Sequence, residues 1–151
     1  MNIPFSPPDI TEEEIEAVAE VMRSGWITTG PKTKELERKM AEFTHTNRGV
    51  CLNSATSCME MALRLFEIGP GDEVIVPAYT YTASASVVCH VGATLRLVDV
   101  EKGTFHIDYA AVESMINENT KAIIPVDLGG VMVDYDRIRA IVESKKSLFR
   151  P

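Results

Sequence analysis

The stretch from Gly49 to Phe66 reads GVCLNSATSCMEMALRLF, and the interpretation of the rest of the chain depends on it. Its first four residues, Gly49 to Leu52, form a short β-type run, and a small polar turn from Asn53 to Ser57 follows. Apolar residues then recur at helical spacing, at Met59, Ala62, Leu63 and Phe66. The pattern predicts a strand, a tight polar turn and a helix.

The start of this predicted helix suits a bound anion. The first N–H groups of a helix have no partner within the helix, and the aligned peptide dipoles place partial positive charge there. Small residues with hydroxyl groups, here Ser54 and Thr56, let a phosphate approach those N–H groups closely. The alternative is that Ser54 or Thr56 only caps the helix, as such residues do at most helix starts. The stretch alone favours the cap and leaves phosphate binding open.

The composition is that of a globular, negatively charged protein. The 151 residues are 45% hydrophobic and 25% charged, which permits a substantial core. The net charge of −7 argues against a nucleic-acid partner and against an acidic membrane surface. No apolar run approaches the ~18 residues of a membrane span, and Met1 is not followed by a basic and then apolar leader. We therefore expect a cytoplasmic protein without a membrane partner.

The cysteines and histidines do not indicate a metal centre. Cys51, Cys58 and Cys89 form an odd set without CxxC spacing, so we expect reduced, mostly buried thiols. The three histidines are scattered and form no HxxxH or HExxH pair. No metal site is predicted.

Amphipathic helices and apolar strands alternate along the chain. Besides the opening strand and helix, helices are expected over residues 12–24, 32–44, 83–92, 108–116 and 134–143. Further strands are expected over residues 73–77, 94–98 and 121–126. No internal repeat or linker divides the chain. The alternation predicts an α/β fold, a three-layer sandwich in which helices cover both faces of a mostly parallel sheet.

Ligands of such folds gather at the carboxyl ends of the strands. Here those ends are residues 53–56, 77–81, 99 and 127–130. The dinucleotide motif GxGxxG and the P-loop motif GxxxxGK[ST] are both absent. What remains is a phosphate site at one strand end and two aromatic residues, Tyr79 and Tyr81, at the next. A planar phosphorylated cofactor needs both features, and pyridoxal phosphate fits them, although spacing alone identifies neither its lysine nor its carboxylate partner.

Six segments, in the same order, resemble the sugar aminotransferases of the DegT/DnrJ/EryC1/StrS family, which have pyridoxal-phosphate fold type I. They are GWITTGP (25–31), NSATS (53–57), GPGDEVIVP (69–77), YTYTASA (79–85), GAT with VDV (92–94 and 98–100) and TKAIIPV (120–126). The resemblance covers nearly the whole chain but only the N-terminal part of the family's length. It implies that residues 1–151 are the N-terminal portion of the cofactor-binding large domain, without its C-terminal part and the small domain.

The resemblance also implies residues that bind the cofactor, pyridoxal 5′-phosphate. Ser54, Ala55 and Thr56 are expected to hold its phosphate, mainly through the backbone N–H groups of Ala55 and Thr56 with help from the Thr56 hydroxyl. Tyr81 occupies the position at which the family has an aromatic ring stacked on the pyridine. Asp127 departs from the family pattern, in which many relatives have a histidine, and it is assigned no role.

The loop from Trp26 to Gly30 allows two interpretations. The residue types alone favour a tryptophan that fills the edge of a core. The resemblance instead implies that Trp26, Thr28, Thr29 and Gly30 border the substrate pocket.

The implied reaction transfers an amino group, from glutamate as donor, to the keto group of a nucleotide-linked sugar. The full-length form is expected to be a homodimer. The Schiff-base lysine, the aspartate at the pyridinium nitrogen and the phosphate contacts of the partner subunit are expected beyond Pro151, so no catalytic residue is predicted within this chain. Two alternatives stay open: a sugar 3-dehydratase of the same fold, with histidine in place of the lysine, and a non-catalytic truncated binding or assembly module.

We predict that the 151-residue polypeptide by itself has no transaminase activity and binds pyridoxal phosphate weakly at best, because none of its lysines can be placed opposite Tyr81. Absorption spectroscopy with the added cofactor checks this expectation. An absorption band of lysine-bound cofactor that borohydride abolishes would contradict it.

Overall fold

The computed structural model describes residues 3–4 and 6–149, and it divides into two compact units, residues 1–51 and 52–151. The sequence has no linker at this boundary, so the division was not foreseen. It follows from packing instead, because both clusters of buried hydrophobic residues consist entirely of residues from the second unit. We describe each unit by itself.

The first unit contains two amphipathic helices, α1 (Glu12–Ser24) and α2 (Pro31–Phe43). A capping box begins α1: Thr11 Oγ1 accepts a hydrogen bond from the Glu13 N–H, and the Glu14 carboxylate accepts one from the Thr11 N–H at 2.7 Å. Gly25, with φ of 73°, ends α1. Helix α2 begins one residue earlier than predicted, since proline is favoured at the first helical position.

The strand predicted over residues 49–52 is wrong. These residues are in neither a strand nor a bridge, because a strand requires a hydrogen-bonded neighbour and no described strand pairs with them. The Cys51 N–H instead donates to the Glu37 carboxylate of α2 at 3.1 Å. The thiols are free, as expected, but the expectation that most of them are buried is also wrong, since Cys51 is half-buried and Cys58 and Cys89 are exposed.

The second unit is built on a sheet of three strands, β1 (Glu73–Pro77), β2 (Thr94–Val98) and β3 (Thr120–Ile123), in the order β2-β1-β3. All pairings are parallel, which confirms the predicted sheet type. Strand β3 is shorter than predicted. The Ile124 N–H still donates to the Ile75 carbonyl at 2.9 Å, but Pro125 has no N–H to continue the ladder.

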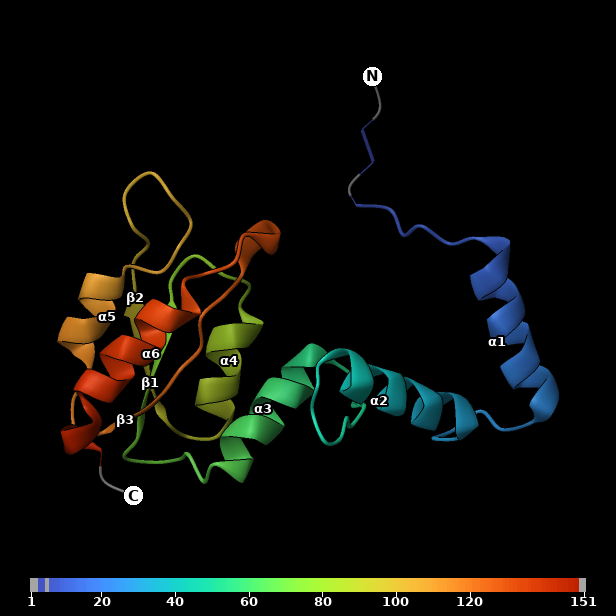
Figure 1. Ribbon diagram of the computed structural model, residues 1–151, viewed down its shortest axis with the longest axis horizontal. Helices are drawn as coiled ribbons and strands as arrows, with labels where there is room; N and C mark the ends of the chain where they lie inside the picture. Colours follow the sequence, from blue (N-terminus) through green and yellow to red (C-terminus); the bar gives the residue numbers. More distant parts are fainter. Residues whose placement is uncertain (1–2, 5, 150–151) are drawn as a thin grey trace. The chain divides into compact units, whose positions relative to one another are not determined.

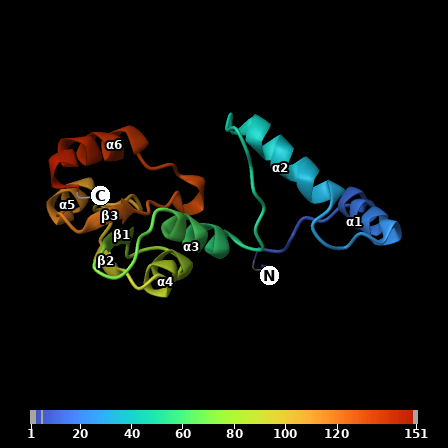
Figure 2. The same ribbon diagram turned by 90° about the horizontal axis from the view of Figure 1, so that it is seen from below.

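Helices cover both faces of this sheet, so the predicted three-layer sandwich is confirmed (Figures 1 and 2). One face is covered by α3 (Ala55–Leu65) and α4 (Ala83–His90), whose side chains cluster with Val74 and Val76. The other face is covered by α5 (Tyr109–Met115) and α6 (Tyr135–Ser144), which pack on Ile75. Two 3₁₀ segments complete the unit, η1 (Leu128–Gly130) and η2 (Lys146–Leu148).

Because Ile75 is fully buried in the central strand, Ile75→Ala should lower the free energy of unfolding by roughly 2–5 kcal/mol, through lost burial and a residual cavity. Urea unfolding measures this change. Leu97→Ala in β2 is the control, since Leu97 is 55% exposed, and it should change the free energy by about 1 kcal/mol or less. Equal losses in the two variants would show that β1 is not the centre of the core.

Helices α3 and α4 are joined by a charged contact between the middle of α3 and the C-terminal end of α4. The Glu60 carboxylate lies 2.7 Å from an Arg64 guanidinium nitrogen and 2.9 Å from His90 Nδ1. The hydrogen bonds from Arg64, and secondarily from His90, hold the pKa of Glu60 below its ordinary value of 4.5.

A carboxylate whose pKa is lowered by folding stabilises the folded state above its ordinary pKa, and this contribution is lost as the pH falls through the folded-state pKa. Glu60→Gln should therefore lower the melting temperature at pH 7 and have a smaller effect below pH ~4. Thermal melts across this pH range measure both effects. Glu113→Gln, at an exposed position of α5, should show no such pH-dependent difference, and the same loss in both variants would argue against the contact.

Candidate functional site

Ser54 is the N-cap of α3. Its backbone is extended, with φ of −161° and ψ of 158°, and its Oγ accepts a hydrogen bond from the Ser57 N–H at 3.1 Å. Its carbonyl accepts the first helical hydrogen bond, from the Cys58 N–H, at 3.1 Å. The capping interpretation of the sequence is thus confirmed for Ser54.

The same cap leaves two backbone N–H groups at the start of α3 without a partner among the described residues. Within the part of the chain that the structure describes, no acceptor is found for the N–H groups of Ala55 and Thr56, and none is found for the Thr56 hydroxyl. These two N–H groups lie at the positive end of the helix dipole. The donor set therefore fits a phosphate, which takes several N–H and O–H donors at a helix start.

Helices α3 and α4 run in the same direction on one face of the sheet (Figure 1). Glu60 in the middle of α3 contacts His90 at the end of α4, so the N-terminal ends of both helices lie toward the edge where the strands end. This edge carries Ser54, Ala55 and Thr56 before α3 and Tyr81 before α4. The structure thus brings the four predicted cofactor residues to one edge of one unit.

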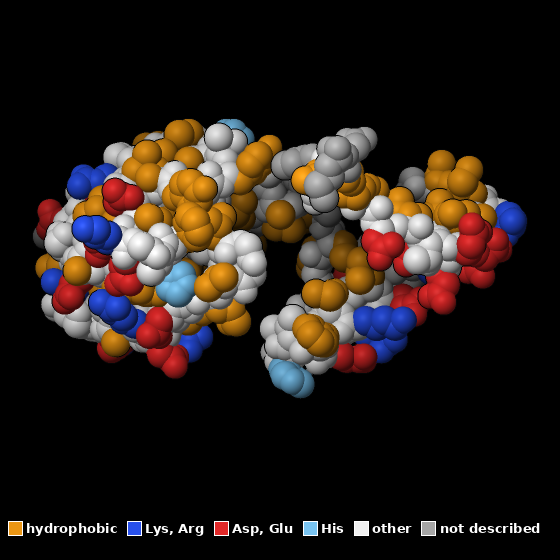
Figure 3. All heavy atoms as spheres, turned by 90° about the horizontal axis from the view of Figure 1, so that it is seen from above, with side chains coloured by type: hydrophobic (Ala, Val, Ile, Leu, Met, Phe, Trp, Pro, Cys, Tyr) orange, Lys and Arg blue, Asp and Glu red, His pale blue; other side chains and the backbone are white. Residues whose placement is uncertain are grey.

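Tyr81 is the more exposed of the two tyrosines that follow β1, since Tyr79 is 56% exposed. Its side chain is 79% exposed, and its carbonyl accepts a hydrogen bond from the Ser84 N–H at 3.2 Å, which places it in the turn that begins α4. One face of the Tyr79 ring is covered, because this ring stacks on the ring of Phe105 with centroids 5.2 Å apart. Figure 3 views the molecule from this side and shows hydrophobic side chains exposed on the second unit. Among the described residues, no ring contact is found for Tyr81, so both faces of its ring are open to a ligand.

Asp127 orders the loop that follows β3. Its carboxylate accepts hydrogen bonds from the Val133 N–H and from the Tyr135 hydroxyl, both at 2.9 Å. Burial and the hydrogen bond to Asp127 raise the pKa of Tyr135 above its ordinary value. The sequence indicated no role for Asp127. No spacing rule indicates its two hydrogen bonds, because the partner residues lie six and eight positions further along the chain.

The four predicted substrate residues lie in the other unit, in the loop between α1 and α2. Trp26 is 58% exposed, so it does not fill the edge of a core. Its indole Nε1–H donates to the Thr29 carbonyl at 3.0 Å, and a Cβ on Gly30 would lie 2.6 Å from the same nitrogen. The indole thus rests against Gly30. Trp26, Thr28 and Gly30 line one cavity of about 410 Å³, whereas Thr29 contributes the carbonyl.

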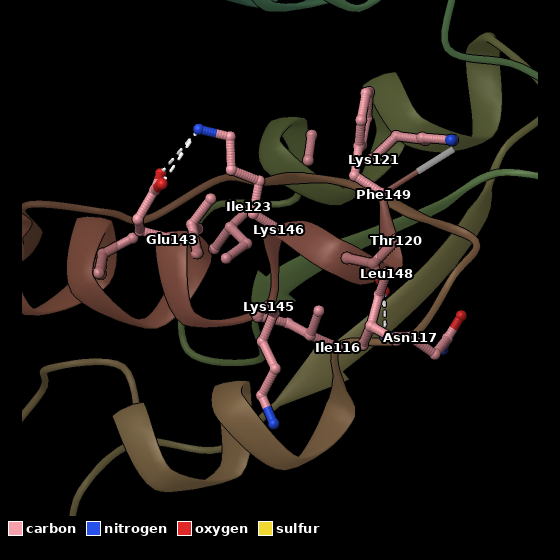
Figure 4. Close-up of a pocket in the computed structure, with 13 residues that line it drawn as sticks. Ile116, Asn117, Thr120, Lys121, Ile123, Glu143, Lys145, Lys146, Leu148 and Phe149 are labelled. Atoms are coloured by element: carbon pink, nitrogen blue, oxygen red, sulfur yellow. Dashed lines mark hydrogen bonds and ion pairs between the residues drawn. The ribbon is translucent and has the colours of Figure 1, made fainter. Parts of the chain in front are cut away.

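A separate cavity of about 390 Å³ lies between the start of β3, α6 and η2 (Figure 4). Its walls are mainly apolar, with the Lys121 ammonium 4.5 Å from the centre of the Phe149 ring. Lys146 and Glu143 form an ion pair of 3.0 Å at its rim. None of the predicted site residues lines this cavity.

Residues 3–4 and 6–149 show neither a metal centre nor a helix that could span a membrane. These residues contain no group of three or more His, Cys, Asp or Glu side chains arranged to hold a metal ion. No helix formed by them has the length and apolar character needed to cross a membrane.

Three solved structures show what the chain is similar to. Spr1654 from Streptococcus pneumoniae, assigned as a sugar aminotransferase and solved in apo, PMP and PLP forms, is 60% identical over 99% of this chain, with a TM-score of 0.96. DesV from S. venezuelae is 36% identical over 89% of this chain, with a TM-score of 0.84. NtdA from Bacillus subtilis, solved with bound PMP, is 33% identical over 95%, with a TM-score of 0.87.

The chain spans 38%, 36% and 34% of the lengths of these three proteins, respectively. Its fold is therefore that of a part of these three proteins. A family model described as the DegT/DnrJ/EryC1/StrS aminotransferase family matches residues 8–149, almost the whole chain. The resemblance seen in six sequence segments is confirmed by this match and by the three structures. The chain belongs to the DegT/DnrJ/EryC1/StrS aminotransferase family.

Proposed function

We propose that the full-length protein is a pyridoxal-phosphate-dependent aminotransferase that transfers an amino group from glutamate to a nucleotide-linked keto sugar. Family membership supports the reaction type, and the bound PLP and PMP of similar structures support the cofactor. The sugar substrate is supported by the similarity to Spr1654, which is assigned as a sugar aminotransferase. Since this chain covers 38% of that protein, the activity belongs to the full-length polypeptide.

The observation that carries this proposal is the pair of N–H groups at the start of α3. Ser54 accepts hydrogen bonds from the Ser57 N–H with its Oγ and from the Cys58 N–H with its carbonyl. Of the N–H groups in the first turn of α3, only those of Ala55 and Thr56 then have no acceptor among the described residues. Three oxygens of a phosphate monoester match two N–H donors and the Thr56 hydroxyl. Ser54 therefore acts by setting the helix start, and Ala55 and Thr56 act as the donors.

Tyr81 supplies the second half of the proposed cofactor site. Its ring is exposed at the same edge of the sheet as the start of α3, and an exposed aromatic face can stack on a planar heteroaromatic ring. Held by its phosphate and its ring, the cofactor supplies an electrophilic carbonyl group and an electron sink for amino-group transfer. The role of this chain is then to bind and orient the cofactor.

The remaining parts of the proposal concern the assembly and the substrate loop. Trp26, Thr28, Thr29 and Gly30 are proposed to border the substrate, because three of them line one cavity and Thr29 holds the Trp26 indole. The full-length protein is proposed to act in the cytoplasm as a homodimer, without a nucleic-acid or membrane partner. The net charge of −7 supports the absence of a nucleic-acid partner.

We predict that pyridoxamine 5′-phosphate, which has no aldehyde to react with lysines, binds at the start of α3. In amide-resolved NMR titrations of this chain, the Ala55 and Thr56 signals should shift saturably with this compound and not with pyridoxamine, which lacks the phosphate. Ala55→Pro should weaken binding roughly tenfold or more, because it deletes one N–H donor to a charged phosphate.

The proline variant is suited to this test because residue 55 is the first helical position, where proline is tolerated, and Ser54 already has the extended backbone that precedes proline. Glu12→Pro is the matched control, at the first position of α1, and it should bind pyridoxamine 5′-phosphate like the parent chain. Shifts that spare Ala55 and Thr56, or equal binding by both variants, would refute the phosphate site.

A further inference from the structure

The turn between β1 and α4, which carries Tyr81, is anchored at several points within the second unit. The Ala78 N–H donates to the Val98 carbonyl of β2 at 2.7 Å. The Thr80 hydroxyl lies 3.2 Å from the hydroxyl of Ser84, a buried residue of α4, and the Ser84 N–H donates to the Tyr81 carbonyl. The backbone of the turn is therefore held, whereas the Tyr81 ring has no ring contact among the described residues.

The ring of Tyr79 is a further anchor of this turn. It stacks on the ring of Phe105 with centroids 5.2 Å apart and the two planes inclined by 17°. Phe105 belongs to the loop between β2 and α5, which stands at the edge where the strands end (Figure 1). Because a single residue separates Tyr79 from Tyr81, holding the Tyr79 ring restricts the backbone from which the Tyr81 ring projects.

The loop that presents Phe105 is held at its base. Val100 and Ile107 form an antiparallel bridge. Inside this bridge, the Glu101 N–H donates to the His106 carbonyl at 2.9 Å. Ile107, two positions after Phe105, is buried among the hydrophobic residues that pack on the α5 and α6 side of the sheet. Phe105 therefore has a fixed place although its own side chain is more than half exposed.

An ion pair attaches the same loop to α6. The Glu101 carboxylate lies 3.3 Å from a guanidinium nitrogen of Arg137, and this guanidinium lies 4.3 Å from the centre of the Tyr109 ring. Tyr109 is buried, and its hydroxyl accepts a hydrogen bond from the Asp134 N–H at 2.7 Å. The support of Phe105 thus extends from the exposed edge of the sheet to the hydrophobic core.

The stacked pair is not part of the core packing. Tyr79 and Phe105 are both more than half exposed, and neither belongs to the two clusters of buried hydrophobic residues. Their contact joins two loops without burying either ring. Such a contact suits a ligand site on an exposed edge, because binding costs less free energy when the binding groups are already held in place.

We propose that Phe105 is a positioning residue of the cofactor site. By stacking on Tyr79 it fixes the turn between β1 and α4, so that the Tyr81 ring is positioned to stack on the pyridine ring of the cofactor. Phe105 acts through Tyr79 and not through a contact of its own with the cofactor. The inference rests on the proposed function for the role of Tyr81, and it adds a residue that the sequence did not single out.

The first test needs no ligand. Phe105→Leu removes the ring and keeps an apolar side chain at an exposed position. The exchange rate of the Ser84 amide hydrogen, whose N–H donates to the Tyr81 carbonyl, should rise roughly threefold or more, the effect of losing an aromatic pair. The Cys58 amide hydrogen, whose N–H donates within the first turn of α3, should exchange as in the parent chain. An unchanged Ser84 rate would overturn the inference.

Two ligands then separate the positioning of Tyr81 from a general loss of structure. Pyridoxamine 5′-phosphate has a phosphate and a ring, whereas O-phosphoethanolamine has a phosphate and no ring. Phe105→Leu should raise the dissociation constant of the first roughly threefold or more and leave that of the second unchanged, both read from the Ala55 and Thr56 amide signals. Phe105→Tyr keeps the stacked pair and should restore the constants of the parent chain.

Phe66→Leu is the matched control, because Phe66 is an exposed phenylalanine of the same unit with no ring contact among the described residues. It should leave both constants unchanged. An equal loss for the two ligands in Phe105→Leu, or no loss for either, would overturn the inference. If pyridoxamine 5′-phosphate shifts neither the Ala55 nor the Thr56 amide, the proposed phosphate site fails, and the Ser84 exchange rate still decides whether Phe105 orders the turn.

Discussion

The structure of the second unit depends on the burial of β1 between two parallel strands and two layers of helices. Val74, Ile75 and Val76 are fully buried, and because successive side chains of a strand point to opposite faces, Ile75 belongs to one cluster and its two neighbours to the other. This alternation requires apolar helices on both sides. Parallel pairing with β2 and β3 then places the ends of all three strands at one edge.

At this edge, helix capping by Ser54 and anion binding by the next two residues do not compete, because they use different N–H groups of α3. Ser54 accepts hydrogen bonds from the N–H groups of Ser57 and Cys58 and so fixes the first turn of α3. The N–H groups of Ala55 and Thr56 remain directed outward. A helix start without a cap would fray and present no fixed donors. The same sheet geometry brings the Tyr81 turn to this edge, since α3 and α4 run side by side in one direction (Figure 1).

The helices and buried strands could be predicted because their signals are local. Thr11 with Glu14 marks the start of α1, Asp108 and Asp134 cap α5 and α6, and the apolar run of β1 has the length of a buried strand. The prediction of a strand over residues 49–52 failed for the opposite reason. An apolar run of four residues is a strand only when a neighbour pairs with it, and the sequence contains no information about that neighbour.

The sequence by itself determined the alternation of helices and strands, the polar helix start at Ser54 and the six segments that indicate the family, since all of these are properties of residues close together in the chain. Only the tertiary structure decided which aromatic ring is free, because the stacking of Tyr79 on Phe105 joins residues far apart in the sequence. It also decided that Glu20 and Lys32 form an ion pair at 3.2 Å and line the same cavity as Trp26. Such contacts depend on how helices and loops pack, which no spacing rule encodes.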